Sequence, residues 1–125
     1  AFEQLLKAIA EVVRQRGHLT GLDGRRLYAR SDHGQLNILL QSAAALIAKQ
    51  FVLNIDKAIK QENLDAEIVA FVHDEAQIST TNQEGVANDV GNIAIRCAKE
   101  AGEHFRFKIP IGAEFRIGLN WAATH

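Results

Sequence analysis

One stretch of this sequence holds three adjacent titratable side chains between two apolar runs. Residues 68–72 and 76–81 are rich in β-branched and aromatic side chains, which favour strands. His73, Asp74 and Glu75 stand between the two runs, where a tight turn would have to lie. Carboxylates are costly to place beside a core, so the turn is also where they are best tolerated. The stretch therefore predicts a β-hairpin, from about Glu67 to Thr80, with carboxylates on its bend.

The paired acids on this bend suggest metal binding. Adjacent carboxylates repel each other unless a cation, a donor or solvent intervenes. Mg²⁺ takes hard oxygen ligands, of which protein carboxylates typically supply one or two. The hypothesis is that Asp74, with Glu75 beside it, binds metal. The residues alone leave open a second interpretation, a solvated turn without a ligand.

A two-metal phosphoryl-transfer site needs a further carboxylate across the metals. The candidates in this chain are poor, because Asp23 and Asp32 lie in a basic region and Glu67 is at the far end of its strand. The sequence also has no Gly-rich phosphate loop and no nucleophile elbow, which excludes those enzyme classes.

Composition sets the outer limits. A chain of 125 residues, 47% hydrophobic and 23% charged, is long enough for one globular domain with a core. The formal net charge of −1 gives no global support for nucleic-acid binding. Cys97 is the only cysteine, which excludes an intrachain disulfide and fits a reducing cytosol. We expect no membrane partner, because no apolar run approaches the length of a membrane span.

The first third of the chain predicts a helix and a basic hairpin. Apolar residues recur at helical spacing over residues 2–16, and Gly17 is a plausible stop. Residues 18–31 predict a hairpin with Asp23-Gly24 as its turn dipeptide. Arg25 and Arg26 would project near its tip, where charge alone favours a solvated, charged hairpin without a ligand.

A long helix should follow, with Ser31 or Asp32 as N-cap and an end near Gln61. Its expected core face consists of Leu36, Leu40, Ala43, Ile47 and Ala58. A neighbouring strip is polar in the first two turns and apolar further along. The polar strip is either a helix end emerging into water or a row of donors and acceptors that faces a polar ligand such as base edges; it consists of His33, Asn37 and Gln41.

The last part of the chain predicts one more helix and two extended segments. Thr81 or Asn82, with Glu84 behind it, can cap a helix that runs to about Glu103. Residues 105–117 alternate in hydrophobicity on both sides of Pro110 and Gly112, which is typical of strands. The expected class is α+β, with antiparallel hairpins packed against two or three helices in a single domain of residues 1–125.

At the predicted hairpins the sequence resembles the family-A DNA polymerases, the bacterial polymerase I and phage replicative type. Val72-His73-Asp74-Glu75 resembles the third conserved motif of that family. The ending Gly118-Leu119-Asn120-Trp121-Ala122-Ala123-Thr124-His125 resembles the carboxyl terminus of the phage enzymes. The hairpin and long helix that precede the third motif, most closely in the phage branch, are matched by Gly21-Leu22-Asp23-Gly24-Arg25-Arg26, Arg30-Ser31, His33, Asn37, Gln41 and Ser42.

The resemblance implies roles for the matching residues. Asp74 would be one of two palm aspartates that hold the catalytic Mg²⁺ ions, and Glu75 an accessory acid beside the site. His73 would contact the primer strand near its 3′ end. Asn37 and Gln41 would touch the minor groove of the primer–template. For the remaining positions the implication is weaker: His33 stands where many relatives have Arg, and Arg25, Arg26 and Arg30 are assigned to the nucleic-acid backbone on charge alone.

The chain lacks other parts that the resemblance implies. These are the palm motif with the second aspartate, the nucleotide-gripping fingers helix, and the thumb and exonuclease domains. We therefore expect a partial palm of a DNA-directed DNA polymerase from a bacterial or phage-infected cytoplasm, with primer–template DNA, dNTP and the remaining polymerase chain as partners. The two-metal site would be completed outside this chain, and the chain alone would be inactive.

Three further expectations remain open at this point. A sheet edge left without its neighbour should make the fragment self-associate, as a homodimer or by segment exchange. The chain could instead be a non-catalytic split subunit or a prophage remnant. A small metal-dependent phosphohydrolase using Asp74 and Glu75 is the alternative from another class.

Overall fold

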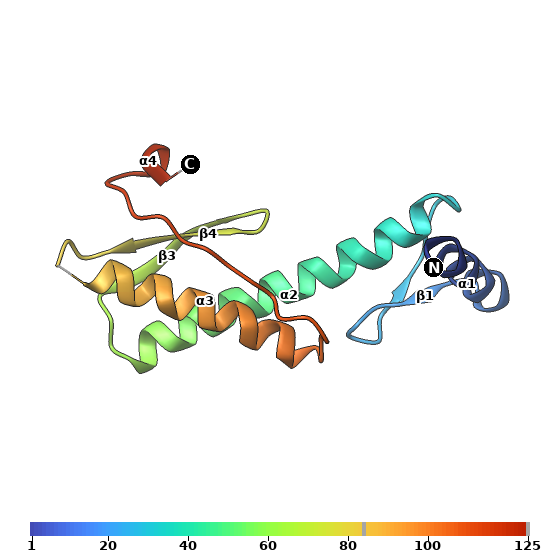
Figure 1. The fold of residues 1–125 in the computed structure, drawn as a ribbon, viewed down its shortest axis with the longest axis horizontal. Coiled ribbons are helices and arrows are strands. Elements are labelled where there is room, and N and C mark those ends of the chain that lie inside the picture. Colours follow the sequence, from blue (N-terminus) through green and yellow to red (C-terminus); the bar gives the residue numbers. More distant parts are fainter. Residues whose placement is uncertain (84, 125) are drawn as a thin grey trace. The chain divides into compact units, whose positions relative to one another are not determined.

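The computed structural model, which describes residues 1–83 and 85–124, is a mixed α and β structure, as expected (Figure 1). It has two compact units, Ala1–Leu46 and Ile47–His125. That residues 1–125 act as a single domain stays a prediction. The elements in chain order are α1 (Phe2–Arg16), β1 (Leu19–Thr20), β2 (Arg26–Leu27), α2 (Gly34–Gln61), β3 (Ala66–Val72), β4 (Glu75–Thr80), α3 (Val86–His104) and α4 (Trp121–Thr124).

The first unit opens with α1, whose bounds agree with the prediction. Gly17 ends the helix in the left-handed conformation at φ 74°, and its N–H donates to the carbonyl oxygen of Val13 at 2.7 Å. Glycine adopts this conformation without a Cβ clash, which explains why the helix ends there. Ile9 is the buried residue of α1.

The predicted basic hairpin is present, although its strands are only two residues long. β1 and β2 pair antiparallel, with Leu19 opposite Leu27. Gly24 has φ 81°, and its N–H donates to the carbonyl oxygen of Gly21 at 3.0 Å. The turn dipeptide Asp23-Gly24 therefore fixes the bend, as its sequence indicated.

α2 begins in the first unit and ends in the second. It starts at Gly34 because residues 31–34 form a turn, so the expected N-cap is wrong by two positions for Ser31 and by one for Asp32. Asp32 still supports the first turn, since its Oδ1 accepts from Nε2 of the buried Gln35 at 3.0 Å. Leu40, expected in the core, is 58% exposed.

By length and composition, α2 could cross a membrane, and it is the one such helix among the described residues. The expectation that no apolar run reaches that length is therefore wrong. A single helix of this kind is weak evidence for a membrane, because core helices of soluble proteins meet the same criteria.

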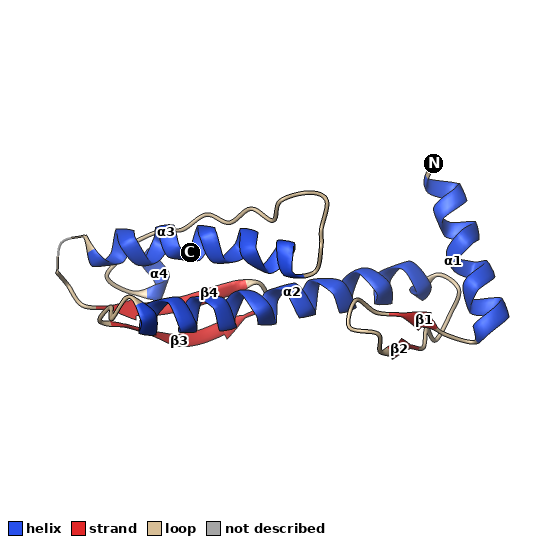
Figure 2. Cartoon of the chain, turned by 90° about the horizontal axis from the view of Figure 1, so that it is seen from below, coloured by secondary structure: helices blue, strands red, loops and turns tan. Residues whose placement is uncertain are grey.

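The core of the second unit is formed by the C-terminal half of α2, by α3 and by the β3–β4 hairpin (Figure 2). Ile55 and Cys97 are its most buried large side chains, at 0% and 1% exposure. Cys97 is thus a core residue, as expected. Around them pack further residues from both helices and from the hairpin, namely Ala58, Ile59, Ile93, Ala66, Ile68, Ala76 and Ile78.

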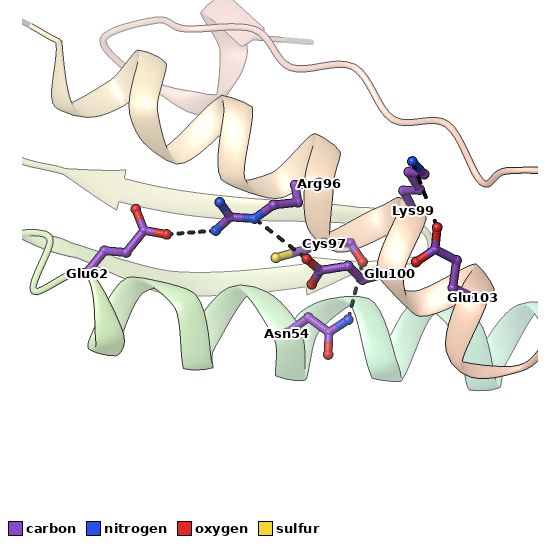
Figure 3. Close-up of polar contacts among 7 residues, drawn as sticks. All are labelled: Asn54, Glu62, Arg96, Cys97, Lys99, Glu100 and Glu103. Carbon is purple, nitrogen blue, oxygen red and sulfur yellow. Dashed lines mark hydrogen bonds and ion pairs between the residues drawn. The ribbon is translucent and has the colours of Figure 1, made fainter.

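Polar contacts at the surface of this core link α3 to α2 and to Glu62, the residue after α2, and one lies within α3 (Figure 3). Nη2 of Arg96 donates to Oε1 of Glu62 at 2.7 Å, and Nε of Arg96 lies 3.7 Å from Oε1 of Glu100. The hydrogen bond to Glu62 raises the pKa of Arg96 above its usual value. Nδ2 of Asn54 donates to the carbonyl oxygen of Cys97 at 3.3 Å.

α3 starts later than its sequence indicated. Its N-cap is Gly85, at φ 96°, without a side-chain capping bond, so the expected caps Thr81 and Asn82 are wrong. Glu84, the expected second member of the capping box, lies outside the described residues. The helix ends at His104, one residue beyond the expected end.

Residues 105–120, which we call the strap, leave α3 and run back along it as an extended segment (Figure 1). The expected strands at 105–109 and 113–117 are absent from this described part of the chain. The local pattern suited a strand, but no neighbouring strand pairs with it. Side chains hold the strap instead, because Phe115 packs on Gly91 and Ile111 on Gly102.

Candidate functional site

The bend of the β3–β4 hairpin lies where the sequence placed it. Val72 pairs with Glu75, so His73 and Asp74 alone form the turn. His73 has φ 57°, a conformation uncommon for residues other than glycine. Residues held in such conformations are found preferentially at active sites and ligand clamps. Two-residue hairpin loops require positive φ, however, and Asn63 and Arg106 share this conformation, so the tight bend itself accounts for the geometry of His73.

The three titratable residues of the bend are not equivalent. His73 and Asp74 are exposed, whereas Glu75 is half-buried as the first residue of β4. The carboxylate of Glu75 accepts a hydrogen bond from the side-chain amide of Gln77. The expectation that Glu75 lies on the bend itself is thus corrected. Of the two carboxylates, Asp74 is the one presented to solvent.

A bulge adjusts the strand that leads to this bend. The pairing register shifts between Ile68 and Ala70, which leaves Val69 as the extra residue of β3. Beyond the bulge, Phe71 and Val72 are each 38% exposed. Bulges bend a strand, re-aim its side chains and occur often beside active sites. The bulge therefore lies between the core part of β3 and the exposed bend.

The bend can supply part of a metal site. Asp74 offers an exposed hard oxygen ligand, which suits Mg²⁺, because that ion commonly takes one or two carboxylates and fills its remaining positions with water and phosphates. Within residues 1–83 and 85–124, no group of three or more His, Cys, Asp or Glu side chains could hold a metal ion. The described residues fit a shared site better than a self-contained one.

The arginines of the first unit differ in availability. Nε of Arg25 donates to Oδ2 of Asp23 at 2.6 Å, so its charge is already paired. Partial desolvation raises the pKa of Asp23, but the hydrogen bonds and charge of Arg25 outweigh it and lower the pKa below the usual 3.8. Arg26 and Arg30 are exposed, and neither has an ion pair among the described residues. These two are the better candidates for phosphate contacts.

The polar strip is exposed throughout. His33 lies in the turn before α2, and Asn37 and Gln41 follow at intervals of four residues in the first two turns of the helix. A spacing of four residues places helical side chains on one face. The strip therefore has the geometry that contact with an extended polar ligand requires.

Sequence reasoning missed a groove beside this strip. The groove, of about 570 Å³, lies between α1 and the first turns of α2, and His33 and Asn37 contribute to its lining. Phe2 and Leu40 also line it and are 63% and 58% exposed. The signal in the sequence was the recurrence of apolar residues at helical spacing in α1.

The predicted site residues fall into two sets. The arginines and the polar strip belong to residues 1–46, and His73, Asp74 and Glu75 belong to residues 47–125. The residues of the second set are adjacent in sequence, at the turn and at the start of β4.

Comparisons with known proteins agree on one family. The model of DNA polymerase family A matches residues 2–123. Two phage proteins named DNA-directed DNA polymerase are similar over 89% of this chain, with 35% identity for Escherichia phage T7 and 34% for Enterobacteria phage T3. A protein named DNA polymerase I, from Treponema pallidum, is 28% identical over 94% of this chain. The chain spans only 16% of the length of each phage protein and 12% of the bacterial one.

A solved structure is similar in fold to most of this chain. It is the POL domain of Pol1 from M. smegmatis in complex with DNA primer-template and dNTP. The similarity covers 79% of this chain and 19% of that one, at a TM-score of 0.69 and 26% identity.

Proposed function

Because the chain belongs to DNA polymerase family A, we propose that it is a portion of the palm of a DNA-directed DNA polymerase. In this proposal Asp74 is one of the metal-binding aspartates of nucleotidyl transfer. The observation that carries it is the exposed Asp74 on a two-residue bend, inside the region that matches the family.

The proposed metal site is shared with residues outside this chain. Asp74 would hold Mg²⁺, and Glu75, which is half-buried in β4, would act beside the site as an accessory acid. When bound, Mg²⁺ would supply Lewis-acid polarisation of the phosphoryl group. Asp74 would fix the position of the ion, and the turn would fix the position of Asp74.

The proposed nucleic-acid contacts follow from exposure and chemistry. Asn37 and Gln41 carry neutral donors and acceptors, which can read the acceptors that every base pair presents in the minor groove. His33 would extend this strip toward the phosphates. His73 would contact the primer strand, while Arg26 and Arg30 would bind phosphates. Arg25 could do so only after release from Asp23.

A chimera tests the proposal. Residues 2–123 would replace the matching segment of the phage T7 polymerase, the 35% identical relative. We expect Mg²⁺-dependent primer extension by the chimera, and loss of at least about a thousandfold in Asp74→Asn, by analogy with the loss of one strong transition-state interaction. Asp65→Asn, a matched change at another exposed aspartate of the same unit, should leave extension intact. Equal activity of the two variants would contradict the role of Asp74.

The isolated chain should have no polymerase activity of its own. Since the chain spans 16% of its phage relatives, we propose that it is inactive alone and needs the remaining polymerase chain. Primer extension by the 125-residue chain with Mg²⁺ would contradict this. A split subunit that completes a polymerase in trans is compatible with it, whereas a phosphohydrolase is not favoured by the family match. The place of action would be the cytoplasm of a bacterial or phage-infected cell.

Self-association of the isolated chain is also part of this proposal. β3 and β4 form a two-stranded sheet, so each strand has an outer edge without a neighbour among the described residues. Val69 on β3 is 62% exposed. Open edges with apolar side chains promote pairing between chains.

A further inference from the structure

Gln35, in the first turn of α2, is a polar residue in an apolar place. It is 5% exposed, and no other polar or charged side chain that the structure describes is buried. It lines the groove between α1 and α2 together with apolar residues of α1, among them Phe2, Leu6 and Ile9. Burial of a side-chain amide costs free energy unless the amide is hydrogen-bonded. A leucine would fill this place without that cost, so the hydrogen bond that Gln35 makes is its distinguishing feature.

This hydrogen bond closes the turn that contains His33. Nε2 of Gln35 donates to Oδ1 of Asp32 at 3.0 Å, and the backbone N–H of Gln35 donates to the carbonyl oxygen of Asp32 at 3.3 Å. The N–H of Gly34 donates to the carbonyl oxygen of Ser31 at 3.0 Å. His33 therefore lies between two residues that are joined by both a side-chain bond and a backbone bond, which limits the conformations that its backbone can adopt.

The burial of Gln35 also sets the direction in which the polar strip faces. Successive positions of a helix are about 100° apart, so Asn37 lies about 200° around the axis from Gln35. Gln41 lies one turn beyond Asn37 on the same side of the helix. Asn37 and Gln41 are both exposed, as this geometry requires when Gln35 is buried. One buried side chain thus fixes both the rotation of the first helical turn and the loop that holds His33.

We propose that Gln35 is a positioning residue for the contact between the polar strip and DNA. This inference rests on the proposed function, in which the strip contacts the primer–template. Gln35 itself does not touch the DNA in this proposal. Its side chain anchors the start of α2 and holds Asp32, and so keeps His33, Asn37 and Gln41 in one row. A turn that is ordered before binding loses less conformational entropy when the DNA binds.

Gln35→Leu separates positioning from a role in stability alone. Leucine suits the apolar groove but cannot donate to Asp32, whose exposed carboxylate can bond to water instead. We therefore expect the unfolding free energy of the 125-residue chain to be unchanged or higher. Amide hydrogen exchange at Gly34 and at residue 35 should become faster, because the turn has lost one of its bonds. A lower unfolding free energy with unchanged exchange would overturn the proposal, since Gln35 would then support only the fold.

The DNA contact is measured in the chimera with the phage T7 polymerase. We expect Gln35→Leu to raise the dissociation constant for primer–template about tenfold, the scale of one polar contact, and to change kcat at saturating primer–template by less than about twofold. Asp32→Asn and Asp32→Ala remove the same charge, but only asparagine keeps an acceptor oxygen. The asparagine variant should therefore bind about tenfold more tightly than the alanine variant, and this difference should disappear when Gln35→Leu is also present.

Gln15→Leu is the matched control. Nε2 of Gln15 donates to Oε1 of Glu11 at 2.6 Å in the same unit, but this bond is exposed, and its loss should change neither affinity nor exchange in the turn. Asn37→Ala tests the proposed function separately, because it removes a side chain that would touch the DNA. Weaker binding by Asn37→Ala with unchanged binding by Gln35→Leu would overturn the positioning role alone. Unchanged binding by both variants would overturn the contact between the strip and DNA, and the positioning role with it.

Discussion

The ring of Phe115 lies directly against the backbone of Gly91, so that a Cβ on residue 91 would fall 2.4 Å from Cδ2 of the ring. The contact joins the strap to α3 without any hydrogen bond. Glycine inside a helix usually costs about 1 kcal/mol relative to alanine. At this position, however, the missing side chain makes room for an aromatic ring.

Gly91→Ala should therefore destabilise the protein despite the better helix propensity of alanine. Overpacking typically costs about 1–3 kcal/mol, which at least cancels the gain of about 1 kcal/mol from helix propensity. We expect faster proteolysis within the strap and an unfolding free energy lower by up to about 2 kcal/mol. Urea titration and limited proteolysis measure these two effects. Gly112→Ala, with nothing within 4 Å of its added Cβ, should change neither.

Ile55→Ala should be among the most damaging changes in the second unit. Ile55 has 0% exposure and lies in the core cluster with Ile93 and Cys97. Truncation of a buried isoleucine to alanine costs about 2–5 kcal/mol. Leu53→Ala, on the same helix at 62% exposure, should cost less than about 0.5 kcal/mol. Equal unfolding free energies for the two variants would contradict the placement of the core.

Cys97 should not react with thiol reagents until the protein unfolds. Desolvation by burial, followed by the charge of Glu100, raises the pKa of its thiol above the usual 9.0. The thiolate is the reactive form, so its fraction at neutral pH is small. Because the folded pKa is the higher one, the unfolded chain ionises first, and stability falls as pH rises above about 9. Reaction with a disulfide reagent, compared with and without urea, measures the protection.

Asp23 should titrate at lower pH than an ordinary aspartate. Its pKa is lowered below 3.8 by Arg25, although desolvation acts in the opposite direction. A lowered folded pKa means that the stabilisation is present above the unfolded value and is lost as pH falls through the folded one. The hairpin therefore loses this contribution below about pH 3.8. NMR titration of the Asp23 carboxyl measures the pKa, and Arg25→Ala should raise it, whereas Arg26→Ala should leave it unchanged.

Local signals were enough to predict most of the elements. α1 ends at Gly17 because a single residue satisfies both the geometry and the hydrogen bond of the helix end. The bend was predicted because strong strand formers flank the polar triplet His73, Asp74 and Glu75, of which the first two form the turn. In both cases the deciding interactions join residues that are close in sequence.

The errors arose where distant residues decide. The alternation in residues 113–117 suited a strand, but a strand needs a partner, and the strap lies against a helix instead. Leu40 had the spacing of a core residue, yet nothing packs over it enough to bury it. The start of α3 depends on a glycine with φ 96°, which gives no side-chain capping signal. The metal and nucleic-acid roles of individual residues stay predictions.

The bulge at Val69 changes how β3 must be interpreted. Before it, Ile68 stands opposite Ile78 and faces the core; beyond it, Phe71 rather than Ala70 stands opposite Ala76. The alternation of β3 side chains between the two faces of the hairpin thus shifts by one residue at Val69. Without Val69 the same pairs would form one uninterrupted ladder, and the turn would still consist of His73 and Asp74. The position of the Asp74 carboxylate is set by the pairing of Val72 with Glu75 next to the turn. Insertions or deletions earlier in β3 would therefore not move it.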